Sequence, residues 1–209
     1  TDECGLEGGP NRGVGDTWTL DVVTPEALQA MLEAREVILR RRYESVIADC
    51  SQARDRLAAA EPAGDEMAVS VARLGESIGR AAGETAEIAR AFRDIRLELD
   101  NNSLLTPEVD MRLIVQIADP LAGLAEADLP PLATACRGVA DPAGARSGLV
   151  RQADDVLARM RALLAMMMEL ESFNEVIERL RDEIRTQEEI RADTLEQQKK
   201  RAREALEGL

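Results

Sequence analysis

The chain has 209 residues, with 40 acidic and 26 basic side chains and no histidine, so its formal net charge at pH 7 is −14. Without histidine, Ser-His or Cys-His catalysis, histidine-ligated zinc and histidine pH switches are excluded. The acidic surplus argues against nucleic-acid binding, because phosphate contacts need a basic face. Aromatic residues make up only 2% of the chain, which disfavours a β-sandwich. The abundance of Ala, Leu, Arg and Glu is typical of long helices.

The first residues differ from the rest of the chain. Residues 1–16 are rich in glycine and resemble a loop, whereas Trp18, Leu20 and Val22 alternate along a predicted β-strand over 17–23. A single strand needs partners, and the remaining residues have helical patterns. We therefore expect residues 1–23 to be the glycine-rich loop and terminal strand of a preceding β-rich domain. The chain also begins with Thr1 rather than Met, as a piece of a larger protein would.

Two long helices are predicted next. Thr24-Pro25-Glu26 has a helix-capping residue followed by proline at the first helical position, and Pro62-Ala63-Gly64-Asp65 breaks the helix after about Glu61. Its predicted core positions are Leu32, Leu39, Tyr43, Val46, Cys50, Ala53, Leu57 and Ala60, with Ile38 and Ile47 widening the stripe. The second helix, about 65–101, has apolar positions in unbroken steps of four and three: Met67, Val71, Leu74, Ile78, Ala81, Thr85, Ile88, Phe92, Ile95 and Leu99. This repeat predicts a helix-packing seam, and the short connection predicts antiparallel neighbours.

The third part is less regular. Asn101-Asn102-Ser103 ends the second helix, and Thr106-Pro107-Glu108 starts a new segment. Pro120 is expected to kink or break this segment, and Pro130-Pro131 to open another short helix that ends near Val139. The predicted core positions of the segment are Leu113, Ile114, Ile117, Leu121 and Leu124.

The last helix is predicted to start at Asp141-Pro142-Ala143. Its core positions are Leu149, Ala153, Val156, Met160, Leu163, Met167 and Leu170. The capping-box pattern at Ser172-Phe173-Asn174-Glu175 leaves open whether one helix or two cover this region. We therefore predict an all-α fold, an elongated antiparallel helical bundle or coiled coil over 24–171, followed by a charged C-terminal helix over 172–209. No uncharged apolar stretch is long enough to span a membrane.

Three glycines, Gly75, Gly79 and Gly83, lie four residues apart within the second helix. Each costs about 1 kcal/mol relative to alanine in a helix interior. We expect them to allow close helix–helix approach inside the bundle, and the alternative is a groove for self-association or a partner.

Sulfur-containing side chains are predicted to be mainly structural. Cys50 and Cys136 are expected to be small core residues, whereas Cys4 could pair with a cysteine upstream of this chain. The three methionines at 166–168 favour core filling over an adaptable binding surface.

The charged residues suggest few sites. A basic cluster formed by Lys199, Lys200, Arg201 and Arg203 is a possible interaction surface for phosphate or anionic lipid, or a favourable set of charges near a helix C-terminus. Neighbouring acids, such as Glu84 with Glu87 and Asp154 with Asp155, are expected to have arginine partners on their own helix. We predict no cofactor, metal site or small-molecule substrate.

Several segments together resemble the C-terminal helical region of large, uncharacterised envelope proteins of planctomycete-type bacteria. They are Trp18–Glu26, Leu39–Asp49, Leu99–Asn102, Ile117–Leu121 and Leu170–Glu175. The resemblance implies a membrane-anchored N-terminal part followed by β-rich modules, an extracytoplasmic location and no catalytic residues.

The leading functional hypothesis is a non-catalytic helical scaffold or protein-interaction domain that binds itself or another envelope protein. The alternative is a ligand-binding or sensor domain with an apolar cavity near residues 106–140. An enzyme that relies on carboxylates alone is a third hypothesis, and it requires two buried acids that converge in a cleft.

Overall fold

The computed structural model describes residues 22–61 and 65–207, including their side chains except those of 170–182 and 200–207. In this described part all regular structure is helical, which confirms the all-α class. The strand predicted over 17–23 lies outside the described residues apart from Val22 and Val23, which have no regular secondary structure, and Cys4 also lies outside them. The elements are α1 (Pro25–Ala59), α2 (Asp65–Asn101), α3 (Pro107–Asp110), η1 (Met111–Ala118), α4 (Asp119–Gly123), η2 (Leu124–Asp128), α5 (Leu129–Arg137) and α6 (Pro142–Glu207).

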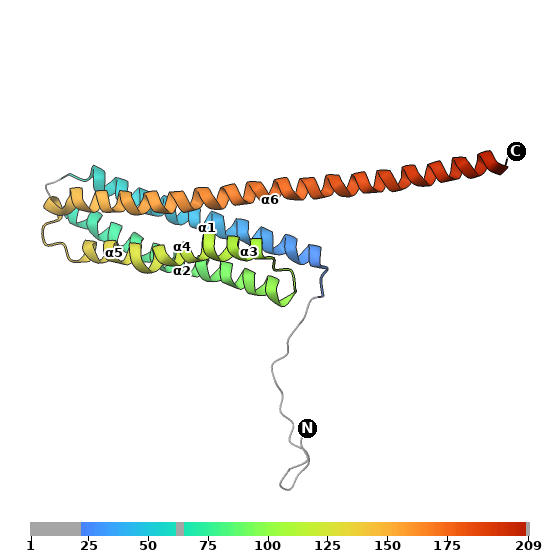
Figure 1. Cartoon of the computed structure of the whole chain (residues 1–209). Helices are drawn as coiled ribbons and strands as arrows, with labels where there is room; N and C mark the ends of the chain where they lie inside the picture. Colours follow the sequence, from blue (N-terminus) through green and yellow to red (C-terminus); the bar gives the residue numbers. More distant parts are fainter. Residues whose placement is uncertain (1–21, 62–64, 208–209) are drawn as a thin grey trace, which may run out of the picture.

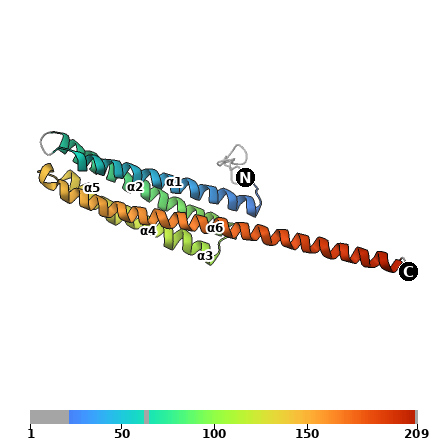
Figure 2. The ribbon, with the colours of Figure 1, turned by 90° about the horizontal axis from the view of Figure 1, so that it is seen from above.

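The described elements group into four rods, which are α1, α2, the run from α3 to α5, and α6. These rods run up and down the long axis of the molecule (Figure 1). The pieces from α3 to α5 follow one another as a single rod. The second rod, α2, contacts α1, α5 and η1, while α6 lies along α1. Seen from above, α6 continues well past the ends of the other rods (Figure 2).

Three helix starts follow the predicted capping patterns. The hydroxyl of Thr24 accepts a hydrogen bond from the Ala27 N–H (3.2 Å), and that of Thr106 accepts one from the Val109 N–H (3.3 Å). The carboxylate of Asp141 accepts one from the Gly144 N–H (3.1 Å). These bonds satisfy N–H groups that have no partner within the helix.

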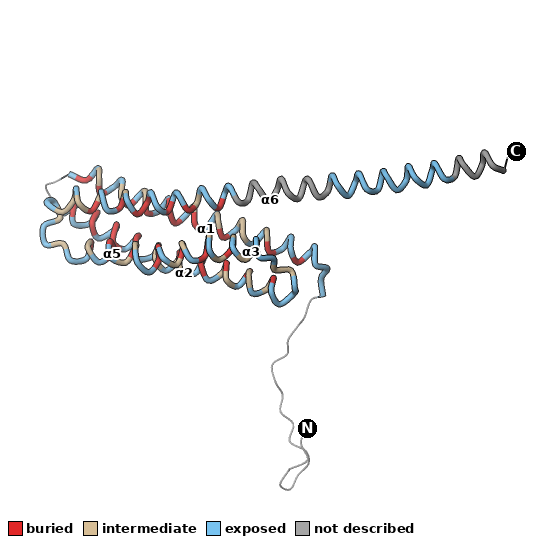
Figure 3. Tube along the Cα trace, in the orientation of Figure 1, coloured by how far each residue is buried: buried red, intermediate tan, exposed pale blue. Residues whose placement is uncertain are grey.

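The core lies along the inward faces of the rods (Figure 3). All ten seam positions predicted on α2 are buried, as are all eight positions predicted for the stripe of the first helix. Ile47 is also buried, but Ile38 is 58% exposed, so the prediction for Ile38 is wrong. Each helical residue turns about 100° from the last, and the neighbouring Leu39 takes the inward position instead.

The rod over 107–137 does not end at Pro120. Just before each proline site the hydrogen bonding changes from the α to the π pattern: the Asp119 N–H donates to the Ile114 carbonyl, and the Leu129 N–H donates to the Leu124 carbonyl. Proline lacks an N–H and its ring clashes with the carbonyl four residues earlier in an α-helix. The wider π turns shift this pattern by one residue, so the helix continues through Pro120 and Pro130.

The C-terminal region is one helix of 66 residues, about 99 Å long at 1.5 Å per residue. The capping-box pattern at 172–175 therefore lies inside α6 and does not start a new helix. Met167 is the last of the described side chains of α6 that is buried, and every side chain over 183–199 is exposed. We call the part of α6 after Met167 the arm.

Candidate functional site

The glycine run has two different environments. A Cβ atom at Gly75 would lie 2.8 Å from the Cβ of Cys136 on α5, so Gly75 makes the close approach that the spacing predicts. Gly79 and Gly83 are exposed, and a Cβ at either position would meet no atom within 4 Å. The prediction of close helix approach therefore does not hold for Gly79 and Gly83, because both positions are exposed to solvent.

Ion pairs between rods mainly involve arginine. Arg42 pairs with Glu84 across α1 and α2 (2.6 Å), and Arg54 of α1 pairs with Asp154 of α6 (2.7 Å). The expected pairing within one helix holds for Glu87, which pairs with Arg90, but not for Glu84 and Asp154. Exposed ion pairs contribute little to stability, and we infer that these pairs mainly fix the register of neighbouring rods.

Buried polar groups lie in the core rather than in a cleft. Cys50 and Cys136 are buried free thiols, as predicted, and Tyr43 is fully buried on α1. Burial raises the pKa of the Cys50 thiol to about 11, although a hydrogen bond with Ser77 opposes the shift. Burial also raises the pKa values of Tyr43 and Cys136. These groups stay neutral and surrounded by apolar side chains, which does not suit nucleophilic chemistry.

The raised thiol pKa predicts a loss of stability in alkali. Above about pH 9 the unfolded chain ionises Cys50 first, whereas the folded chain keeps it protonated up to about pH 11. The unfolded state then binds fewer protons, so the free energy of unfolding falls over this range, by about 2–3 kcal/mol for Cys50 alone. Urea unfolding at a series of pH values should show a shallower alkaline fall for Cys50→Ala than for the unchanged chain. Equal falls in the two proteins would contradict the prediction.

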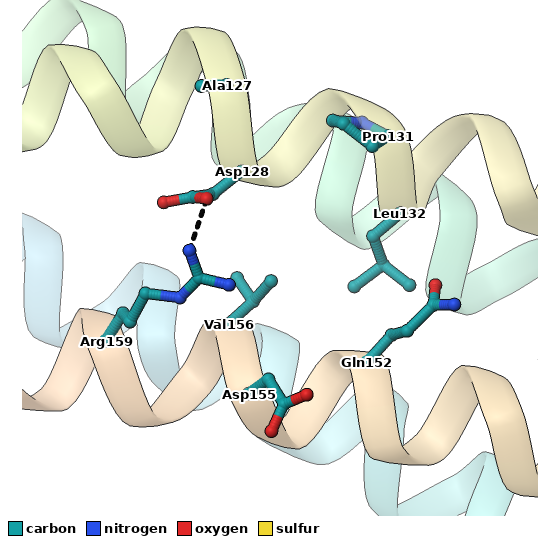
Figure 4. A pocket seen from close by; sticks show the side chains of 8 residues that line it. All are labelled: Ala127, Asp128, Pro131, Leu132, Gln152, Asp155, Val156 and Arg159. Carbon is teal, nitrogen blue, oxygen red and sulfur yellow. Dashed lines mark hydrogen bonds and ion pairs between the residues drawn. The ribbon is translucent and has the colours of Figure 1, made fainter.

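A groove lies between η2 and α5 on one side and α6 on the other, with a volume of about 320 Å³. Asp128 forms an ion pair with Arg159 across it, and Gln152 and Asp155 lie on the α6 side (Figure 4). The groove is open and lined by both polar and apolar residues, unlike the apolar cavity expected near residues 106–140. The predicted core positions of that segment are instead buried in the bundle, apart from Ile114, which is partly buried.

Acidic side chains do not converge in the part of the chain that the structure describes. No Asp or Glu among these residues is buried, and none of their acidic and cysteine side chains gather into a group that could hold a metal ion. An enzyme that relies on carboxylates alone requires a pair of buried acids. Among the described side chains, which are those of 22–61, 65–169 and 183–199, no such pair is found.

The arm carries apolar side chains into solvent. Ile184, Ile190 and Leu195 are each about half exposed or more. Of the predicted basic cluster, Lys199 is exposed, while the side chains of Lys200, Arg201 and Arg203 lie outside the described set. These residues belong to the charged C-terminal helix predicted over 172–209, which the structure shows as the last part of α6 with apolar residues exposed on its surface.

No protein-family model matches the chain, and the searches of curated proteins and of solved structures give no significant match. Among the described residues, none of the helices is both long and apolar enough to cross a membrane.

Proposed function

We propose that this chain is a non-catalytic helical scaffold whose bundle holds the arm for docking to a protein partner. The observation that carries the proposal is the solvent exposure of Ile184, Ile190 and Leu195 on α6, after Met167, its last described buried side chain. An isolated helix has little stability of its own in water, because most helix stability in proteins comes from packing an apolar face. A partner that covers apolar side chains of the arm supplies that packing.

The rest of the molecule suits a rigid support. The four rods share one continuous core, and arginine pairs join α1 to both α2 and α6. Such a support fixes the direction in which the arm projects. From the resemblance described above, we further propose that the domain belongs to a larger extracytoplasmic protein of a bacterial cell envelope.

Photo-crosslinking in cells that express the whole protein tests the docking role. A photoreactive benzophenone amino acid in place of Glu188 on the arm should give a discrete adduct with a protein. The matched control carries the same group in place of Val115, an exposed residue of η1 on the bundle. Adducts of equal yield from both positions, or none from position 188, would contradict the proposal.

A further inference from the structure

We propose that the partner of the arm is the arm of a second copy of this chain, bound antiparallel; this inference rests on the proposed docking function. It starts from one face of the arm. Ile184 and Leu195 are 11 residues apart, which is close to three full turns, so they lie on the same side of the helix. Glu188 and Arg191 lie between them on this side, four and seven residues after Ile184. We call these four residues the docking face.

The order of residues on the docking face is self-complementary when one helix is reversed. In the direction of the chain the order is apolar, acidic, basic, apolar. An antiparallel copy with its two-fold axis between residues 189 and 190 sets Ile184 beside Leu195 of the second copy and Glu188 beside Arg191. Each kind of contact occurs twice, as the symmetry of a two-fold interface requires.

A parallel pair lacks this match. With the two arms in register, Glu188 meets Glu188 of the other copy and Arg191 meets Arg191. Like charges that face each other oppose association. The charge order on the docking face therefore selects the antiparallel arrangement.

The charge along the whole arm supports the same arrangement. From Glu169 to Glu196 the sequence has ten acidic and four basic residues, whereas 197–207 has four basic and two acidic residues. Antiparallel arms bring each basic end beside the acidic stretch of the other. With the axis between 189 and 190, residue 207 lies beside residue 172 of the other copy. Residue 172 comes after Met167, which is the last described side chain of α6 that is buried in its own bundle.

Charge reversal gives a sharp test by sedimentation equilibrium over a roughly hundredfold range of protein concentration. The unchanged chain should form a dimer in a concentration-dependent way. Glu188→Arg and Arg191→Glu should each weaken the dimer by about tenfold or more, because each places like charges opposite one another twice. The double variant Glu188→Arg/Arg191→Glu should regain the affinity of the unchanged chain, and an equal mixture of the two single variants should form a heterodimer.

The controls separate this interface from general charge effects. Glu189→Arg changes the net charge by the same amount as Glu188→Arg but lies off the docking face, so it should leave the dimer nearly unchanged. All these positions are exposed on the arm, and far-ultraviolet circular dichroism should report equal helix content in every variant. A monomer throughout the concentration range, or a double variant as weak as the single ones, would overturn the inference. If position 188 still crosslinks to a different protein in that case, the docking function stands and only the identity of the partner is wrong.

Discussion

Phe92→Ala is expected to lower the free energy of unfolding by about 3–5 kcal/mol, because it removes a large side chain from the closed interior of the bundle. Phe92 is 1% exposed on α2, the rod that contacts α1, α5 and η1. The ring belongs to the continuous core of the bundle, so its removal leaves a cavity that the surrounding rods cannot close fully. Urea unfolding followed by circular dichroism measures the loss.

Leu97→Ala is the matched control on the same helix. Leu97 is 52% exposed, so its replacement should change the free energy of unfolding by less than about 1 kcal/mol. If the two variants were equally stable, the repeat on α2 would not be the packing seam of the bundle.

The seam on α2 could be predicted from the sequence because its evidence is local. A step of four and three residues keeps side chains on one side of a helix whatever the helix packs against. Ile38 shows the limit of this reasoning. It is as apolar as Leu39, but its side of α1 is exposed to solvent, and this depends on where the other rods lie.

The path of the chain through Pro120 could not be predicted in the same way. A proline in a helical pattern breaks the α-type hydrogen bonding, and the sequence alone does not say whether the helix ends or widens. Here η1 and η2 lie just before the prolines. The buried side chains of Leu113 and Ile117 hold the first π segment against the core, and that of Leu121 holds the turn after it. Tertiary packing thus keeps the rod continuous.

The ion pairs between rods and the exposure of the arm could not be predicted from the sequence. They depend on how the rods are aligned along their length and on where the shorter rods end. The pairing of Arg54 with Asp154 joins residues 100 positions apart, so it follows only from the alignment of α1 with α6. The exposure of Ile184 and Leu195 likewise depends on the lengths of the other rods. The sequence gives the charges and apolar residues of the arm, and the fold determines that they face solvent.

Gly75→Ala is expected to lower the free energy of unfolding by about 1–2 kcal/mol. The added methyl group would lie 2.8 Å from the Cβ of Cys136, an atom fixed to the backbone of α5, so the two rods must separate. Overpacking of this kind typically costs about 1–3 kcal/mol, and the higher helix propensity of alanine offsets up to about 1 kcal/mol of it. Urea unfolding measures the net change.

Gly79→Ala gives the opposite expectation from the same chemical change. A Cβ at Gly79 meets nothing within 4 Å, so only the gain in helix propensity remains, and the free energy of unfolding should rise by about 0.5–1 kcal/mol.

A Cys136→Gly background removes the atom that Gly75→Ala contacts, so the Gly75→Ala change should become less destabilising there, while the Gly79→Ala change should be unaffected. If Gly75→Ala cost the same in both backgrounds, the contact between α2 and α5 at this position would not be the reason that glycine is needed.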